Sequence, residues 1–95
     1  MKFTNKVVWI TGASSGIGKS TALQFAREGA TLILTALEAD LLQDVRSECL
    51  HLGSPNVTTL PFDLSQIDEL PGLAENALKA YGHIDVFYNN AGISM

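Results

Sequence analysis

The sequence has few of the features that mark several large classes of protein. It holds a single cysteine, Cys49, so no disulfide can form within the chain. No apolar run approaches the ~20 residues that a membrane-spanning helix needs. The residues after Met1 have neither the apolar core nor the cleavage site of a secretory signal. These absences predict a cytoplasmic protein with no membrane partner.

Positive charge is also scarce. Six Lys and Arg stand against ten Asp and Glu, so the formal net charge is −4, and the six cations are scattered along the chain. Proteins that bind nucleic acid concentrate Lys and Arg on one face, because contacts with the phosphate backbone dominate their affinity. The sequence therefore predicts no nucleic-acid partner.

Apolar residues, in contrast, are abundant for so short a chain. Of the 95 residues 46% are hydrophobic and 17% are charged, and this length suffices for one small domain and not for two. Small domains have a large polar surface, so the surplus of apolar residues indicates faces that another segment or subunit covers. The composition is thus a first indication that this single domain is truncated.

Short apolar runs alternate with helical stripes along the chain. Runs rich in β-branched residues predict buried strands at 6–11, 31–36, 56–61 and 84–89. Apolar residues at helical spacing predict three helices between them, at 21–26, 41–52 and 70–81. This order predicts an α/β fold with a Rossmann-like parallel sheet in the strand order 3-2-1-4. Ligands bind such sheets at the carboxyl ends of the strands, beside the first strand.

The turn after the first predicted strand carries a glycine motif. Residues 11–18 read Thr-Gly-Ala-Ser-Ser-Gly-Ile-Gly. Gly12 suits a tight turn, Gly16 lets a diphosphate approach the backbone, and Gly18 lets the next helix pack against the strand. The free N–H groups at the start of that helix attract an anion. The motif therefore predicts a dinucleotide site.

Two other interpretations fit the same turn. Gly18-Lys19-Ser20 matches the end of the phosphate-loop pattern, in which Lys and Ser serve a triphosphate and Mg²⁺. The first glycine of that pattern falls on Ala13, and Gly12 lies one residue too early. This interpretation predicts a fragment of a nucleotide triphosphatase or kinase. The third interpretation is a tight turn in a scaffold that binds no ligand.

Three motifs in order make the chain resemble the short-chain dehydrogenase/reductase family. Residues 11–18 match the family's glycine motif, Asp63-Leu64 follows the third predicted strand, and Asn89-Asn90-Ala91-Gly92 follows the fourth. The resemblance implies that residues 1–95 are the N-terminal part of a single NAD(P)-binding Rossmann domain, in an oxidoreductase that transfers hydride between alcohols and carbonyls. It also implies that the cofactor diphosphate lies against Gly12, Ser14, Ser15, Gly16, Ile17 and Gly18.

The other two motifs imply contacts with the two ends of the cofactor. By resemblance, Asp63 accepts a hydrogen bond from the adenine amino group, and Leu64 lies beside the ring. By the same resemblance, Asn90, Ala91 and Gly92 border the ribose next to the nicotinamide. As residues alone, Asp63 also suits a helix cap or a turn, and the Asn-Asn-Ala-Gly run suits a turn at a strand end.

The sequence does not choose between NAD and NADP. In the family, an acid at the end of the second strand favours NAD, and a basic residue just after it or in the glycine loop favours NADP. Here Ala36, Leu37 and Ser15 hold those positions. Glu38 is close enough in sequence to reach a ribose 2′-hydroxyl, but it also suits the dipole of the second helix. Lys19 suits either a phosphate or an ordinary exposed position on a helix.

The residues that transfer the hydride in the family are missing from this sequence. They are a Ser, the Tyr and Lys of Tyr-x-x-x-Lys, and a further Asn, all after the Asn-Asn-Ala-Gly strand. Neither Tyr81 nor Tyr88 has a Lys four residues on. His51 and His83 have no partner at metal-ligand spacing, so no metal site is predicted. We therefore expect residues 1–95 to turn over no substrate, and their uncovered sheet edge and helices to favour self-association.

Overall fold

The computed structural model describes residues 2–63 and 65–90, and within them it has one four-stranded parallel sheet. The strands are β1 (Val7–Thr11), β2 (Thr31–Thr35), β3 (Val57–Thr59) and β4 (Val86–Asn89). They lie in the order β3-β2-β1-β4, and all three strand pairs are parallel. The predicted α/β class and strand order are confirmed.

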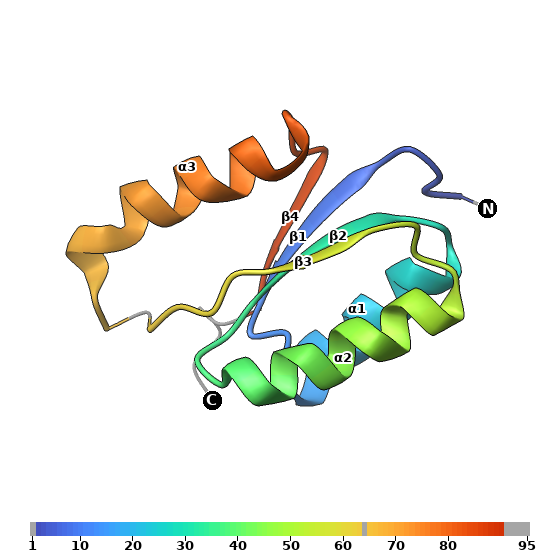
Figure 1. Cartoon of the computed structure of the whole chain (residues 1–95), viewed down its shortest axis with the longest axis horizontal. Coiled ribbons are helices and arrows are strands. Elements are labelled where there is room, and N and C mark those ends of the chain that lie inside the picture. The colour runs from blue at the N-terminus through green and yellow to red at the C-terminus, as the bar shows by residue number, and fades with distance from the viewer. Residues whose placement is uncertain (1, 64, 91–95) are drawn as a thin grey trace.

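Helices cover both faces of the sheet. They are α1 (Gly16–Arg27), α2 (Ala39–Leu52), the short 3₁₀ helix η1 (Ile67–Glu69) and α3 (Leu70–Tyr81). Figure 1 shows α1 and α2 together on one face and α3 on the other. The connection from β1 to β2 through α1 therefore lies on one face of the sheet, and the connection from β3 to β4 through α3 lies on the other. Since β4 pairs with β1, the chain changes face beside β1.

The two central strands form the core. Every residue of β1 is buried, and the strand's side chains alternate between two apolar clusters. Val8 and Ile10 join the cluster beneath α1 and α2, whereas Trp9 joins the cluster beneath α3. Full burial of a Val or Ile side chain contributes about 1.5–3 kcal/mol, so these strands hold the sheet in place. The prediction of strands buried on both faces is confirmed for β1 and β2.

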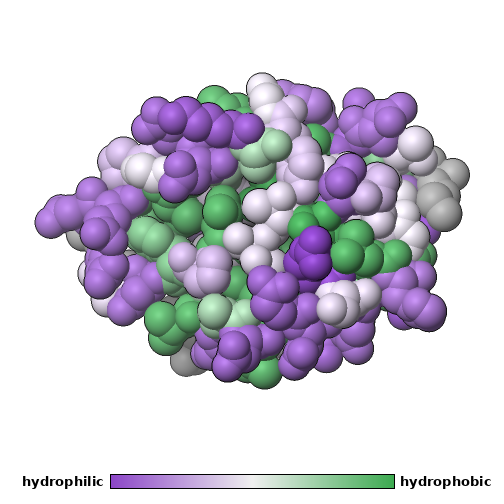
Figure 2. Space-filling model, viewed as in Figure 1, coloured by the Kyte–Doolittle hydropathy of each residue, from purple (hydrophilic) through white to green (hydrophobic). Residues whose placement is uncertain are grey.

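The outer elements differ from the expected pattern. In α3 the apolar stripe is wider than the buried face, since Leu73 and Ala77 are buried but Leu78 is 50% exposed. Phe87 of β4 packs against Trp9 on the face that α3 covers, and it is still 52% exposed. On the face drawn in Figure 2, apolar side chains also reach the surface in the band between α3 and α2.

Asp85 links the start of β4 to the start of β1, at the end of the sheet opposite the carboxyl ends of the strands. Its Oδ2 accepts the Val7 N–H at 2.8 Å and lies 3.1 Å from Nε2 of His83. The Val7 hydrogen bond, followed by the His83 and Lys6 charges, holds the pKa of Asp85 below its ordinary value. His83, which the sequence suggested was alone, therefore has a carboxylate partner.

Among the helices of residues 2–63 and 65–90, none combines the length and the apolar character needed to span a membrane.

Candidate functional site

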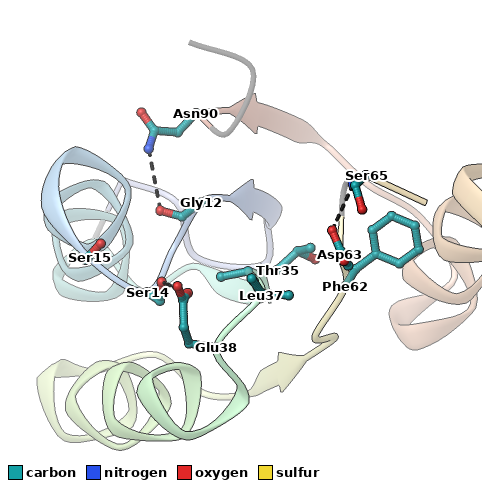
Figure 3. Close-up of a pocket in the computed structure, with 11 residues that line it drawn as sticks. Gly12, Ser14, Ser15, Thr35, Leu37, Glu38, Phe62, Asp63, Ser65 and Asn90 are labelled. Carbon is teal, nitrogen blue, oxygen red and sulfur yellow. Dashed lines mark hydrogen bonds between the residues drawn. The ribbon is translucent and has the colours of Figure 1, made fainter. Parts of the chain in front are cut away.

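All four strands meet a pocket at their carboxyl ends. The cavity has a volume of about 450 Å³, within the usual range for small-molecule sites. Figure 3 shows its lining, which comes from the loops that follow each of the four strands. The lining residues are Gly12, Ser14, Ser15, Thr35, Ala36, Leu37, Glu38, Phe62, Asp63, Ser65 and Asn90. The pocket lies where the sheet order predicts a ligand.

Three positions of the glycine loop favour a residue without a side chain, two for their backbone conformation and one for lack of space. Gly12 and Gly16 have φ of +64° and +58°, a region that residues with a Cβ rarely adopt. Gly18 is excluded by space, since a Cβ there would lie 1.9 Å from the carbonyl oxygen of Gly12. The start of α1 therefore packs directly on the end of β1, and Gly12 lines the pocket with backbone alone.

The start of α1 is open to an anion. Ser15 is the N-cap residue, but its side chain makes no capping hydrogen bond, and the first turn of α1 holds no acidic residue. The positive end of the helix dipole and the unpaired N–H groups of a first turn favour a negative group. Among the predicted loop contacts, Gly12, Ser14 and Ser15 line the pocket, whereas Ile17 is 63% exposed.

A hydrogen bond ties the glycine loop to the start of α2. The hydroxyl of Ser14 donates to Oε1 of Glu38 at 2.9 Å, and both residues line the pocket (Figure 3). Glu38 is the N-cap residue of α2, but its side chain makes no capping hydrogen bond there. Its carboxylate is thus directed toward the pocket and the glycine loop.

Asp63 lies opposite the glycine loop. Its Oδ1 accepts the N–H of Ser65 at 2.9 Å, and this hydrogen bond holds the pKa of Asp63 below its ordinary value. The carboxylate therefore stays ionised at neutral pH. Asp63 holds a turn, as its residue type alone suggests. It also lines the pocket, as the family resemblance requires. Its predicted neighbour Leu64 lies outside the described residues.

The asparagines after β4 bring that strand to the glycine loop. Asn89 accepts a hydrogen bond from the Thr11 hydroxyl at 2.7 Å, which ties β4 to β1. Asn90 lines the pocket, and its Nδ2 lies 3.5 Å from the Gly12 carbonyl oxygen (Figure 3). The other two residues of this motif, Ala91 and Gly92, lie outside the described residues.

The pocket lining also includes three residues that were not predicted from the sequence: Thr35, Phe62 and Ser65. Thr35 is the last residue of β2, and its Oγ1 accepts the indole N–H of Trp9 at 2.9 Å. Phe62 and Ser65 flank the Asp63-Leu64 motif. The sequence shows that these residues end or follow predicted strands. It does not show whether their side chains face the pocket, because that depends on the residue at which each strand ends.

Lys19 points away from the pocket. Its Nζ lies 3.5 Å from Oε2 of Glu48 on α2, and Lys19 is absent from the pocket lining. In a phosphate loop the lysine reaches the β- and γ-phosphates held by the same loop. The geometry therefore gives no support to a triphosphate site.

Across residues 2–63 and 65–90, no group of three or more His, Cys, Asp or Glu is arranged to hold a metal ion.

The fold, the strand order and the glycine loop together define a Rossmann-like α/β segment with its pocket at the switch point of the sheet. The family model described as short chain dehydrogenase matches residues 6–95. The chain therefore belongs to the short-chain dehydrogenase family. This match confirms the resemblance found in the sequence.

Individual relatives agree with this assignment. The chain is 43% identical over 93 residues to 11-beta-hydroxysteroid dehydrogenase-like 4A of Arabidopsis thaliana, covering 98% of this chain and 31% of that protein. It is 38% identical over 96 residues to dehydrogenase/reductase SDR family member 7 of Mus musculus, covering 98% of this chain and 28% of that protein. The chain thus spans less than a third of the length of these relatives.

Solved structures show the same fold. A metagenomic short-chain oxidoreductase in complex with NADP superposes with a TM-score of 0.89 at 34% identity, covering 98% of this chain and 42% of that one. An alcohol dehydrogenase from the archaeon Thermococcus sibiricus, complexed with 5-hydroxy-NADP, gives a TM-score of 0.80 at 34% identity. That match covers 86% of this chain and 35% of the other.

Proposed function

We propose that this chain binds NAD or NADP in the pocket at the carboxyl ends of its strands, as the N-terminal, cofactor-binding portion of a short-chain oxidoreductase. The observation that carries the proposal is the glycine loop, in which Gly18 lets the start of α1 pack against β1 while Gly12, Ser14 and Ser15 line the pocket. Family membership supports it, as do the NADP and 5-hydroxy-NADP complexes of two similar proteins.

The residues present fit the chemistry of a dinucleotide. The glycine loop and the uncapped start of α1 offer N–H groups to the diphosphate, with the hydroxyls of Ser14 and Ser15 beside them. On the opposite wall, the ionised carboxylate of Asp63 suits the adenine amino group, which donates hydrogen bonds. Phe62 and Leu37 add apolar surface next to it.

The remaining contacts are proposed by family resemblance. Within the loop, Gly16, Ile17 and Gly18 continue the diphosphate site. Leu64 lies beside the adenine ring in this proposal, and Asn90, Ala91 and Gly92 border the ribose on the nicotinamide side. Asn90 is the member of that set that lines the described pocket.

The proposed activity of the whole protein is the oxidation of alcohols or the reduction of carbonyls. The bound cofactor supplies the hydride chemistry, and the residues of this chain hold the cofactor in place. The acid-base residues that the family uses have no counterpart in residues 1–95. We therefore propose that this chain binds the cofactor without turning over substrate.

The test is a titration of the 95-residue chain with NADH and NADPH, followed by calorimetry or cofactor fluorescence. We expect saturable binding that Asp63→Ala weakens and that Glu75→Gln on α3, far from the pocket, leaves unchanged. Binding of Mg·ATP that Lys19→Ala abolishes would instead establish the phosphate-loop interpretation. A folded chain that binds none of these nucleotides would be the ligand-free scaffold.

We also propose that the chain self-associates. β4 is an edge strand of the sheet, and Phe87 and Leu78 are about half exposed on the side that α3 covers in part. Unpaired strand edges and exposed apolar side chains favour association. Light scattering over a range of concentrations tests this, and a monomer at the highest concentration refutes it.

A further inference from the structure

The sheet has two edge strands, β3 and β4, and side chains of α2 protect the one at β3. The Asn56 carbonyl accepts the N–H of Leu32 on β2, so the carbonyl of the next residue, Val57, points away from β2. Nε of Arg46 on α2 donates to that Val57 carbonyl at 2.9 Å. The outer side of β3 is therefore already engaged.

β4 has no such protection. Among the described strands it pairs with β1 alone, and its residues 86–89 include no charged side chain and no proline. Natural edge strands often carry charged residues or proline, which discourage pairing with a strand of another chain. Of the two edges, the one at β4 is the better template for a further strand.

The backbone of β4 directs the polar groups of two residues toward this edge. The Asp85 N–H donates to the Val7 carbonyl at 2.9 Å, so the main-chain groups of Asp85 face β1. Main-chain N–H and C=O groups alternate in direction along a strand, so those of Phe87 also face β1. Those of Val86 and Tyr88 face away from β1. The edge thus offers two donors and two acceptors.

The side chains of β4 restrict how a second copy of the strand can pair with it. Phe87 packs against Trp9 on the α3 face and is 52% exposed, whereas Val86 and Tyr88 pack in part against the cluster beneath α1 and α2. Residues directly opposite each other in an antiparallel pair lie on the same face of the sheet. Two copies related by a two-fold axis can therefore be centred on Phe87 or on Tyr88, but not between them.

The register centred on Phe87 makes the strand complementary to itself. It places Phe87 opposite its own copy, and Val86 opposite Tyr88 of the second copy, where the outward main-chain groups meet. Asp85 then lies opposite Asn89 of the second copy, so no like charges face each other. The register centred on Tyr88 would instead place Phe87 opposite Asn89, an aromatic ring against an amide.

The α3 face also has room for the second copy's ring. A pocket of about 380 Å³ lies between α3 and the sheet, and its lining includes Phe87 itself. The other lining residues are Trp9, Thr11, Leu70, Leu73, Ala74 and Asn89. A second Phe87 directly opposite the first would lie beside this largely apolar surface.

We propose that the chain forms a two-fold symmetric dimer in which two β4 strands pair antiparallel about Phe87 and join the two sheets into one. This interface rests on the self-association proposed above and gives it a single geometry, whereas cofactor binding does not depend on it. The paired segment is short, with four residues of β4 from each copy. We therefore expect dimers at high concentration and monomers at low concentration.

The test is disulfide cross-linking of the full 95-residue chain under mild oxidation, read on a non-reducing gel. Phe87→Cys would face its own copy in a non-hydrogen-bonded pair, with Cα atoms about 4.5 Å apart, a distance that a disulfide spans. We expect this variant to become a covalent dimer. The native Cys49 is buried, so the wild-type chain should stay uncrosslinked.

Tyr88→Cys is the matched control for the register. In the proposed dimer the two copies of residue 88 lie two residues apart along the strands, with Cα atoms about 9 Å apart, beyond the reach of a disulfide. This variant should therefore stay monomeric on the gel. Cross-linking of Tyr88→Cys as strong as that of Phe87→Cys, or stronger, overturns the proposed register.

A second variant tests the interface without cysteine chemistry. Phe87→Lys places two like charges opposite each other, and we expect it to raise the dimer dissociation constant at least about tenfold by light scattering. Leu41→Lys is its control, since Leu41 is 44% exposed on α2, away from β4, and should leave the constant unchanged.

The outcomes separate the proposals. Association that Phe87→Lys does not weaken overturns this interface, although self-association stands. A chain that is monomeric at the highest concentration overturns both. The titration with NADH and NADPH decides cofactor binding independently of either result.

Discussion

Replacing Gly18 with alanine tests the packing on which the pocket depends. The added Cβ would lie 1.9 Å from the carbonyl oxygen of Gly12, 2.7 Å from its carbonyl carbon and 2.9 Å from Nδ2 of Asn90. Two of these three atoms are backbone, so the clash cannot be relieved by rotating a side chain. Either α1 moves away from β1, or the glycine loop changes its path.

The expected cost is large for a chain of this size. Overpacking a core costs about 1–3 kcal/mol and occasionally more, and a clash with backbone belongs at the upper end. Alanine returns about 0.5–1 kcal/mol through its helix propensity, so the free energy of unfolding should fall by about 2–3 kcal/mol. At about 4–8 °C per kcal/mol, Tm should fall by about 8–24 °C.

Thermal unfolding followed by circular dichroism measures this change. Gly72→Ala is the matched control, because Gly72 lies in the first turn of α3 and has no atom within 4 Å of an added Cβ. It should keep or slightly raise Tm. If Gly18→Ala unfolds within about 2 °C of the wild type, less than the shift of a single kcal/mol, the close packing of the loop is refuted.

Three further predictions concern side chains outside the glycine loop. The pKa of the Asp85 carboxyl lies below its ordinary value of 3.8, because its ionised form accepts the Val7 N–H. This contact stabilises the fold above pH 3.8, and the stabilisation is lost as the pH falls below that value. Asp85→Asn should therefore make the loss of stability at acid pH less steep. Burial, with a smaller contribution from Glu48, raises the pKa of the Cys49 thiol to about 11, so a thiol reagent at neutral pH should modify it only after denaturation. Trp9 is the only tryptophan and contacts the pocket residue Thr35, so NADH binding should quench its fluorescence.

Each of these has a result that contradicts it. An Asp85→Asn variant that loses stability with falling pH as steeply as the wild type would show that Asp85 is not the group that titrates. Rapid modification of Cys49 in the folded chain would mean that it is not buried. Saturable NADH binding with unchanged Trp9 emission would place the cofactor away from the end of β2.

The central part of the fold could be predicted because local signals and packing agree there. The apolar runs of β1 and β2 are buried on both faces, and the two short crossovers between them and β3 fix parallel neighbours. The outer elements were predicted less well. The stripe of α3 includes Leu78, which is half exposed, because how much of a helix is covered depends on what lies next to it.

The candidate site, too, could be predicted from the sequence only in part. The glycine loop follows from residue types alone, because the turn and the close approach can be made only without a side chain. The pairing of Ser14 with Glu38 could not be derived, since these residues are 24 positions apart and meet only when β1 and β2 end side by side. For the same reason the sequence left the role of Glu38 open between the helix dipole and the ligand.

Dinucleotide binding at the carboxyl ends of the strands can be tested by an NMR titration of the ¹⁵N-labelled 95-residue chain with NAD⁺. We expect saturable shifts of the backbone amides in the glycine loop, from Gly12 to Gly18, together with those of Glu38 and Asp63 around the same pocket. Absence of shifts, or shifts confined to α3 or to the opposite edge of the sheet near Asp85, would contradict it.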